Sequence, residues 1–309
     1  MLDGVLIIDK EAGPTSHDVV DGVRKILKTR KVGHTGTLDP AATGVLPLVL
    51  GKATKLSRYL TGTNKTYRAT IHLGVVTETL DAEGEVIETK PVEVDESMVL
   101  AAIEQFRGEI DQVPPMYSAK KHQGKRLYEL ARQGIEVERP AKTITIFDLE
   151  VVEISLPTVV VDVTCSAGTY IRVLADDIGK KLGCGAHLSA LRRTAVGRFD
   201  IGEAITLEEL ADDPEGGLSR IIPLGKALIA LPRIDLPQDV VKMIGNGYQL
   251  TVADLRTLDT PDFGEDDALA LGVEGGDVVA VARALMPSDA IANTRREKRA
   301  VKTERVFVR

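Results

Sequence analysis

Apolar and polar residues follow two periods along the first part of the chain, and each period predicts a different element. Residues 2–9 contain the short apolar run Val5 to Ile8, and residues 45–50 are almost entirely apolar, which is typical of buried strands. Residues 65–74 alternate between apolar and polar, as a half-buried strand does. Ser16 precedes apolar residues at helical spacing, so we expect it to cap an amphipathic helix whose buried face holds Val19, Val20, Val23, Ile26 and Leu27.

The later elements follow the same two periods. We expect strands at 143–154 and 158–165, a helix near 95–107, and a further helix that Gly168 or Thr169 opens. Because strands and helices intermix without a regular βαβ alternation, the pattern predicts an α+β fold with a mixed, largely antiparallel sheet.

Proline and glycine residues cluster between positions 212 and 237, and we place a domain boundary near 230. Residues 1–230 then form the larger domain. Residues 231–309 consist of short strand-like runs separated by Gly, Asp and Pro turns, which predicts a small β-rich domain.

Composition narrows the class of protein. Of the 309 residues, 43% are hydrophobic and 28% are charged, and no stretch of 18 residues is continuously apolar. The N-terminus lacks the basic region of a signal peptide. The two cysteines and five histidines show neither a disulfide framework nor the spacing of metal ligands. We therefore expect a cytoplasmic protein without a membrane span and without a metal.

Charge is unevenly distributed, although the net charge is −7. Residues 24–68 contain ten Lys or Arg against a single acid, Asp39, whereas residues 76–115 hold eleven acids against two basic residues. Residues 116–142 and the tail 295–309 are again basic. Such blocks predict a polarised surface that binds a polyanion in spite of the net charge, although solvated helix faces give the same pattern.

The acid inside the most basic block lies in a glycine-rich loop, GHTGTLDPAATG, at residues 33–44. Positive charge keeps a carboxylate ionised and able to act as a nucleophile or base, although a turn aspartate before proline is also common. His34, in the same loop, is either a stacking group for a base or a solvated histidine. The loop matches neither a Walker A nor a GxGxxG sequence, which argues against a nucleotide-phosphate cradle.

Three other segments contain candidate binding residues. Tyr67 faces the buried side of its strand and either stacks on a planar substrate or packs in the core. Arg172 lies near Tyr170 in the first turn of a helix, where a guanidinium binds a carboxylate or phosphate or forms a surface ion pair. Residues 114–134 interleave Lys and Arg with two tyrosines, which suits single-stranded RNA, although a plain helical hairpin is the alternative.

Five long motifs occur in order between about residues 4 and 210: VGHTGTLDPAATGVLPLVLGKATK, KTYRA, PPMYSAKKHQGKRLYELAR, CSAGTYIRVLADDIGKKLG and LRRTAVGRF. Together they resemble the TruB family of tRNA pseudouridine synthases, except that Glu11 stands where the family usually has proline. The resemblance implies a catalytic domain of pseudouridine synthase type, with a thumb-like RNA-binding insertion at about 114–142. It also implies that residues 231–309 form a PUA-like RNA-binding domain.

The resemblance further implies a reaction and roles for the candidate residues. The reaction is isomerisation of uridine to pseudouridine at position 55 in the T loop of tRNA, by base flipping, with no cofactor and no required protein partner. Asp39 corresponds to the essential aspartate, Tyr67 to the tyrosine that stacks on the target base, and Arg172 to the arginine that pairs with the aspartate. The substrate-binding positions of the family correspond to Lys10, His34, Tyr170 and Leu191.

Two other functions are compatible with these motifs. A guide-RNA-dependent pseudouridine synthase subunit shares the catalytic residues but typically has extra N-terminal residues, whereas this chain begins almost directly at its first predicted strand. A tRNA-binding or tRNA-refolding protein of the same fold would use the same surface without catalysis. The intact Asp39, Tyr67 and Arg172 favour an enzyme.

Overall fold

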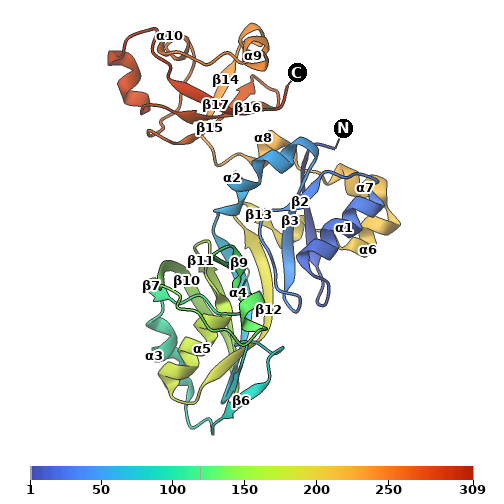
Figure 1. Cartoon of the computed structure of the whole chain (residues 1–309), viewed down its shortest axis with the longest axis vertical. Helices are drawn as coiled ribbons and strands as arrows, with labels where there is room; N and C mark the ends of the chain where they lie inside the picture. The colour runs from blue at the N-terminus through green and yellow to red at the C-terminus, as the bar shows by residue number, and fades with distance from the viewer. Residues whose placement is uncertain (1, 119, 309) are drawn as a thin grey trace.

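The computed structural model describes residues 2–118 and 120–308, and its larger unit is built on a nine-stranded sheet (Figure 1). The main path of that sheet runs through β1 (Gly4–Lys10), β3 (Thr43–Leu50), β12 (Ala186–Val196), β4 (Lys65–Leu73), β11 (Thr158–Cys165), β10 (Lys142–Ser155) and β7 (Gly108–Gln112). Two short strands, β2 (Val32–His34) and β13 (Phe199–Asp200), pair with β3 and β12. Strands β3 and β12 are parallel and the other pairs are antiparallel, so the predicted sheet is confirmed.

Helices pack on both halves of this sheet and give each half its own apolar core. Helices α3 (Glu96–Glu104) and α5 (Ile171–Leu182) pack with β4, β10 and β11. Helices α1 (Ser16–Ile26) and α6 (Leu207–Asp212) pack with β1 and β3. The remaining short elements of the unit are η1 (Gly51–Leu56), α2 (Ser57–Thr61), β5 (Val75–Thr77), β6 (Val86–Thr89), η2 (Ile201–Glu203), α7 (Pro214–Ser219) and α8 (Leu224–Ala227).

Two predicted helix starts are wrong by one or two residues. Thr15, and not Ser16, is the N-cap of α1, because its hydroxyl accepts a hydrogen bond from the Asp18 amide and its own amide donates one to the Asp18 carboxylate. Ser16 is thereby free to bind the backbone of Leu38, in the loop after β2. Helix α5 also begins later than expected, with Tyr170 at its N-cap position.

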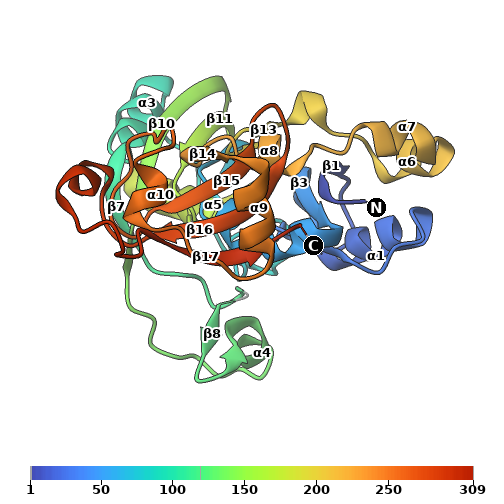
Figure 2. The ribbon, with the colours of Figure 1, turned by 90° about the horizontal axis from the view of Figure 1, so that it is seen from above.

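The residues between β7 and β10 leave the sheet and form a small lobe, here called the thumb (residues 113–141). It contains β8 (Lys121–His122), β9 (Lys125–Arg126) and α4 (Leu127–Ala131). Figure 2 shows β8 and α4 projecting away from the body of the molecule.

The C-terminal residues form a second sheet in the order β14 (Arg233–Leu236), β15 (Ala268–Val273), β16 (Val278–Ala284) and β17 (Val301–Val306). Helices α9 (Gln238–Gly245), α10 (Val252–Leu255) and η3 (Ser288–Asn293) complete this unit. Its Val281 and Phe307 share an apolar cluster with Val5 of β1, and Glu304 binds Arg58 and Tyr59 of α2. The C-terminal unit is therefore packed firmly on the larger one. No helix in the described part of the chain is long and apolar enough to cross a membrane.

Candidate active site

A cavity of about 310 Å³ lies where the loop after β2, strands β4 and β12, and the first turn of α5 meet. Five of the seven residues predicted for the site line it: Asp39, Tyr67, Tyr170, Arg172 and Leu191. The fold thus brings together side chains that are up to 152 positions apart in the sequence. The other two predicted residues, Lys10 and His34, do not line this cavity.

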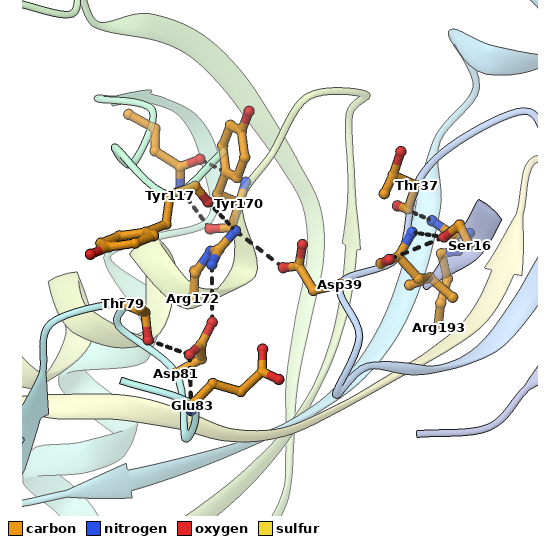
Figure 3. Close-up of polar contacts among 12 residues, drawn as sticks. Ser16, Thr37, Asp39, Thr79, Asp81, Glu83, Tyr117, Tyr170, Arg172 and Arg193 are labelled. Carbon is orange, nitrogen blue, oxygen red and sulfur yellow. Dashed lines mark hydrogen bonds and ion pairs between the residues drawn. The ribbon is translucent and has the colours of Figure 1, made fainter. Parts of the chain in front are cut away.

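Arg172 is the centre of the polar contacts at the cavity (Figure 3). Its Nη2 lies 3.1 Å from Oδ2 of the half-exposed Asp39, and it also donates to the Tyr117 carbonyl oxygen at 2.8 Å. Its Nη1 donates to Oδ2 of Asp81, in the β5–β6 turn, at 3.0 Å. Asp81 in turn accepts a hydrogen bond from the Thr79 hydroxyl. One buried guanidinium therefore joins the Asp39 loop, the β5–β6 turn and the thumb.

Three buried side chains hold the backbone of the Asp39 loop. The guanidinium of Arg193 donates to the carbonyl oxygens of Val45 (2.8 Å), Gly36 (3.2 Å) and Thr37 (3.3 Å). The ammonium of Lys10 donates to those of Ala42 (2.7 Å), Pro40 (2.8 Å) and Glu11 (2.9 Å). Ser16 Oγ donates to the Leu38 carbonyl oxygen at 3.0 Å and accepts from the Leu38 amide at 2.8 Å. The position of Asp39 is thus fixed from both sides without use of its own carboxylate.

Arg193 reaches the loop because β12 and β3 are parallel neighbours, with Arg193 opposite Gly44. Gly44 has a φ of +101°, and a Cβ at this position would overlap the backbone of Arg193. Only glycine permits this approach without strain.

The cavity is electrostatically mixed. Burial raises the pKa of the Tyr67 phenol, while the positive charge of Arg193, on the neighbouring strand, acts in the opposite direction. Burial lowers the pKa of the Lys65 ammonium on the cavity wall, and Arg193 adds to this effect. Outside this cavity, burial also lowers the pKa of His34, whose buried Nδ1 has no hydrogen-bond partner within the described part of the chain. The phenol of Tyr67 is therefore neutral in the free protein.

Sequence patterns did not indicate the roles of Asp81, Arg193 and Ser16. Asp81 lies in the acidic block at 76–115, which resembles a solvated surface. Arg193 lies in the LRRTAV segment, where nothing in the local pattern marks one arginine as buried. The described residues contain no group of three or more His, Cys, Asp or Glu that is arranged to hold a metal ion.

Comparison with known proteins identifies the family. Residues 24–171 match the model of the TruB family pseudouridylate synthase (N terminal domain), and residues 172–228 match the tRNA pseudouridylate synthase B C-terminal domain. The tRNA pseudouridine synthase B of Syntrophus aciditrophicus (strain SB) is 44% identical over 308 residues, which cover 99% of each chain. The chain belongs to the TruB family.

Other TruB-family relatives and a solved structure agree with this assignment. The tRNA pseudouridine synthase B of Clostridium kluyveri is 50% identical over 249 residues, which cover 81% of this chain and 86% of the relative. The structure titled "Crystal Structure of a Cbf5-Nop10-Gar1 Complex" matches with a TM-score of 0.80 and 33% identity, and covers 99% of this chain and 85% of that chain. The resemblance drawn from the sequence motifs is confirmed.

Proposed function

We propose that this protein isomerises uridine to pseudouridine in tRNA, at the T-loop position numbered 55. The observation that carries the proposal is the Asp39–Arg172 ion pair at 3.1 Å, on the wall of a cavity that Tyr67 and Leu191 also line. TruB-family relatives at 44% and 50% identity bear the name tRNA pseudouridine synthase B, which supports tRNA as the substrate. We also propose that the protein is cytoplasmic and that it needs no protein partner.

The reaction suits the side chains at the cavity. The N1–C1′ bond of uridine breaks, the uracil turns, and a C5–C1′ bond forms, while C5 loses a proton and N1 gains one. No group donor and no electron acceptor enters this balance. We assign the first step to Asp39, held by Arg172, and contact with the base to Tyr67 and Leu191. Extruding the base costs a few kcal/mol, which these contacts offset.

Tyr67 is suited to stacking as a neutral phenol. It can take the C5 proton only after losing its own, and the positive charge of Arg193 favours that loss while burial opposes it. We assign binding of the surrounding RNA to the thumb and to the C-terminal unit, which we infer to be PUA-like. Tyr170 is assigned to substrate binding at the cavity, His34 to substrate binding outside it, and Lys10 to support of the Asp39 loop.

Mapping pseudouridine in total tRNA tests the proposal. Cells that lack this protein and the same cells after complementation are compared at single-nucleotide resolution, and we expect position 55 to gain pseudouridine on complementation. No change in the T loop would overturn the proposed site. Modification that requires an added guide RNA would instead favour the guide-dependent function, which the Cbf5 complexes among the similar structures raise as a second candidate.

Replacing Lys10 should slow catalysis without altering the cavity wall. Lys10→Met removes the partner of the Ala42 carbonyl oxygen, leaves the Pro40 carbonyl oxygen bonded only to the Gly13 amide, and so loosens the loop that carries Asp39. We expect kcat to fall by about 10- to 100-fold, with KM changed by less than about threefold, since misplacement of a reacting group acts mainly on the chemical step. Steady-state kinetics on an unmodified tRNA measures both constants. Arg192→Gln, which removes a partly exposed ion pair with Asp9, is the matched control; wild-type kcat in Lys10→Met would contradict the role of the ammonium.

Binding of tRNA should depend on salt despite the acidic pI of 5.4. We expect a slope of log K against log salt of roughly −3 to −6, if about five to eight phosphates are contacted on single-stranded or loop RNA. The slope should become less steep when glutamine replaces four exposed basic residues together: Arg295, Arg296, Lys298 and Arg299. The matched control replaces Lys90 and Arg107 in the acidic block, which pair with Glu88, Glu104 and Asp148. A flat salt dependence of the unaltered protein would contradict binding through a polarised surface.

A further inference from the structure

Ser118 in the thumb carries a hydroxyl that no group among the described residues, 2–118 and 120–308, satisfies. Its side chain lines the Asp39 cavity, the residue is only 4% exposed, and its Oγ has no hydrogen-bond partner. Six buried side-chain nitrogen or oxygen atoms in the described part of the chain lack a partner, and Ser118 is the member of this set that lines the Asp39 cavity.

An unpaired buried hydroxyl is unfavourable in the free protein. A serine hydroxyl can donate one hydrogen bond and accept two, and native structures rarely leave all of these unmade. Water solvates the hydroxyl in the unfolded chain, so burial without a partner destabilises the folded state. A ligand in the cavity would supply the missing partner.

The backbone around Ser118 is held firmly beside the catalytic ion pair. Its carbonyl oxygen accepts from the Tyr128 amide of α4 at 3.1 Å, and its own amide donates to Met116 at 2.9 Å. The preceding residue, Tyr117, places its carbonyl oxygen 2.8 Å from Arg172 and donates its phenol proton to Glu78 at 2.9 Å. Ser118 is thus the residue after Tyr117, whose carbonyl oxygen binds the same guanidinium as Asp39.

We propose that Ser118 Oγ hydrogen-bonds the ribose 2′-hydroxyl of the nucleotide that enters the cavity. The proposal rests on the proposed function, in which Asp39 acts on the nucleoside at the glycosidic bond and Tyr67 and Leu191 contact the base. Among the ribose groups next to C1′, the ring oxygen can only accept a hydrogen bond, whereas the hydroxyl on C2′ can both donate to and accept from a serine hydroxyl. Because Ser118 lies on the thumb, the thumb would help to recognise ribose as well as bind the RNA strand. The 2′-hydroxyl is the group that distinguishes RNA from DNA.

A double-substitution cycle on protein and RNA tests this contact. Dissociation constants are measured for a T-arm stem-loop with uridine or 2′-deoxyuridine at position 55, in the Asp39→Asn background with and without Ser118→Ala. We expect each single change to weaken binding by about five- to tenfold, the range of one net hydrogen bond. Both changes together should weaken binding no further than one alone.

Thr169→Val is the matched control, because Thr169 lines the same cavity but its hydroxyl already donates to the Ser166 carbonyl oxygen at 2.9 Å. Its effect should be independent of the 2′-hydroxyl, and it should lower the melting temperature. Ser118→Ala, by contrast, should leave the melting temperature of the free protein unchanged or raise it by about 1–3 °C, since it removes an unpaired buried hydroxyl.

The outcomes separate this proposal from the function on which it rests. Unchanged binding in Ser118→Ala, effects that add with those of 2′-deoxyuridine, or a melting temperature lowered by several degrees would each overturn the ribose contact. Absence of pseudouridine formation by the wild type, measured in parallel on the uridine stem-loop, would overturn the proposed function. The binding cycle does not depend on turnover.

Discussion

Asp39→Asn is expected to abolish pseudouridine formation, with a loss of at least about 10³-fold, while tRNA binding stays within about threefold of wild type. The substitution is nearly isosteric and removes only the negative charge of a half-exposed side chain. Buried groups of Lys10, Ser16 and Arg193 hold the loop, so its conformation does not depend on the Asp39 carboxylate. Single-turnover assays at saturating enzyme separate chemistry from binding.

Asp9→Asn is the control for this loss of charge, because Asp9 pairs with Arg192 outside the cavity. It should retain most of the activity. Residual turnover of more than a few per cent in pure Asp39→Asn protein would show that this carboxylate is not the essential group.

Arg172→Ala is expected to reduce the rate by at least about 100-fold and to lower the melting temperature by several degrees, because breaking a buried ion pair costs about 3–5 kcal/mol. The variant frees Asp39 from its partner and also leaves Asp81, whose side chain is 14% exposed, without its countercharge. It removes the contact with the Tyr117 carbonyl oxygen as well, so the thumb loses one of its contacts with the site. Rate and thermal unfolding are measured on the same preparation.

The pH dependence of Arg172→Ala distinguishes charge from orientation. We expect the rate to stay low when the pH is raised, because the guanidinium orients three groups at once. Arg172→Lys keeps the positive charge but not the planar fork, and its rate should lie between those of Arg172→Ala and wild type. Full recovery of Arg172→Ala at higher pH would mean that Arg172 supplies only charge to the site.

Local patterns were sufficient for the main elements of the larger unit. The apolar runs predicted β1 and β3, because a strand buried on both faces is apolar throughout. The alternation predicted β4, because a half-buried strand has apolar residues on one face only. The motifs also identified five residues that the fold brings to one cavity. Asp39 lies in a loop and Tyr170 and Arg172 lie at the start of α5, whereas Tyr67 and Leu191 lie within β4 and β12.

The sequence did not reveal contacts that exist only in the folded chain. Lys10 was predicted to lie near the substrate, but its ammonium lies behind the Asp39 loop and binds carbonyl oxygens. The burial of Arg193 depends on the parallel pairing of β12 with β3, which no local pattern encodes. The packing of Phe307 and Val281 against Val5 likewise depends on how two sheets meet. Deleting the residues after 230 would therefore expose this shared core as well as remove cations.

Tritium release from an unmodified tRNA transcript tests the proposed reaction most directly. The transcript carries [5-³H]uridine and is incubated with the purified protein alone, without guide RNA. Because C5 loses its proton when the C5–C1′ bond forms, we predict one equivalent of tritium per tRNA, and none when position 55 is replaced by cytidine. Absence of release from the uridine transcript, or equal release from the cytidine transcript, would contradict pseudouridine formation at this position.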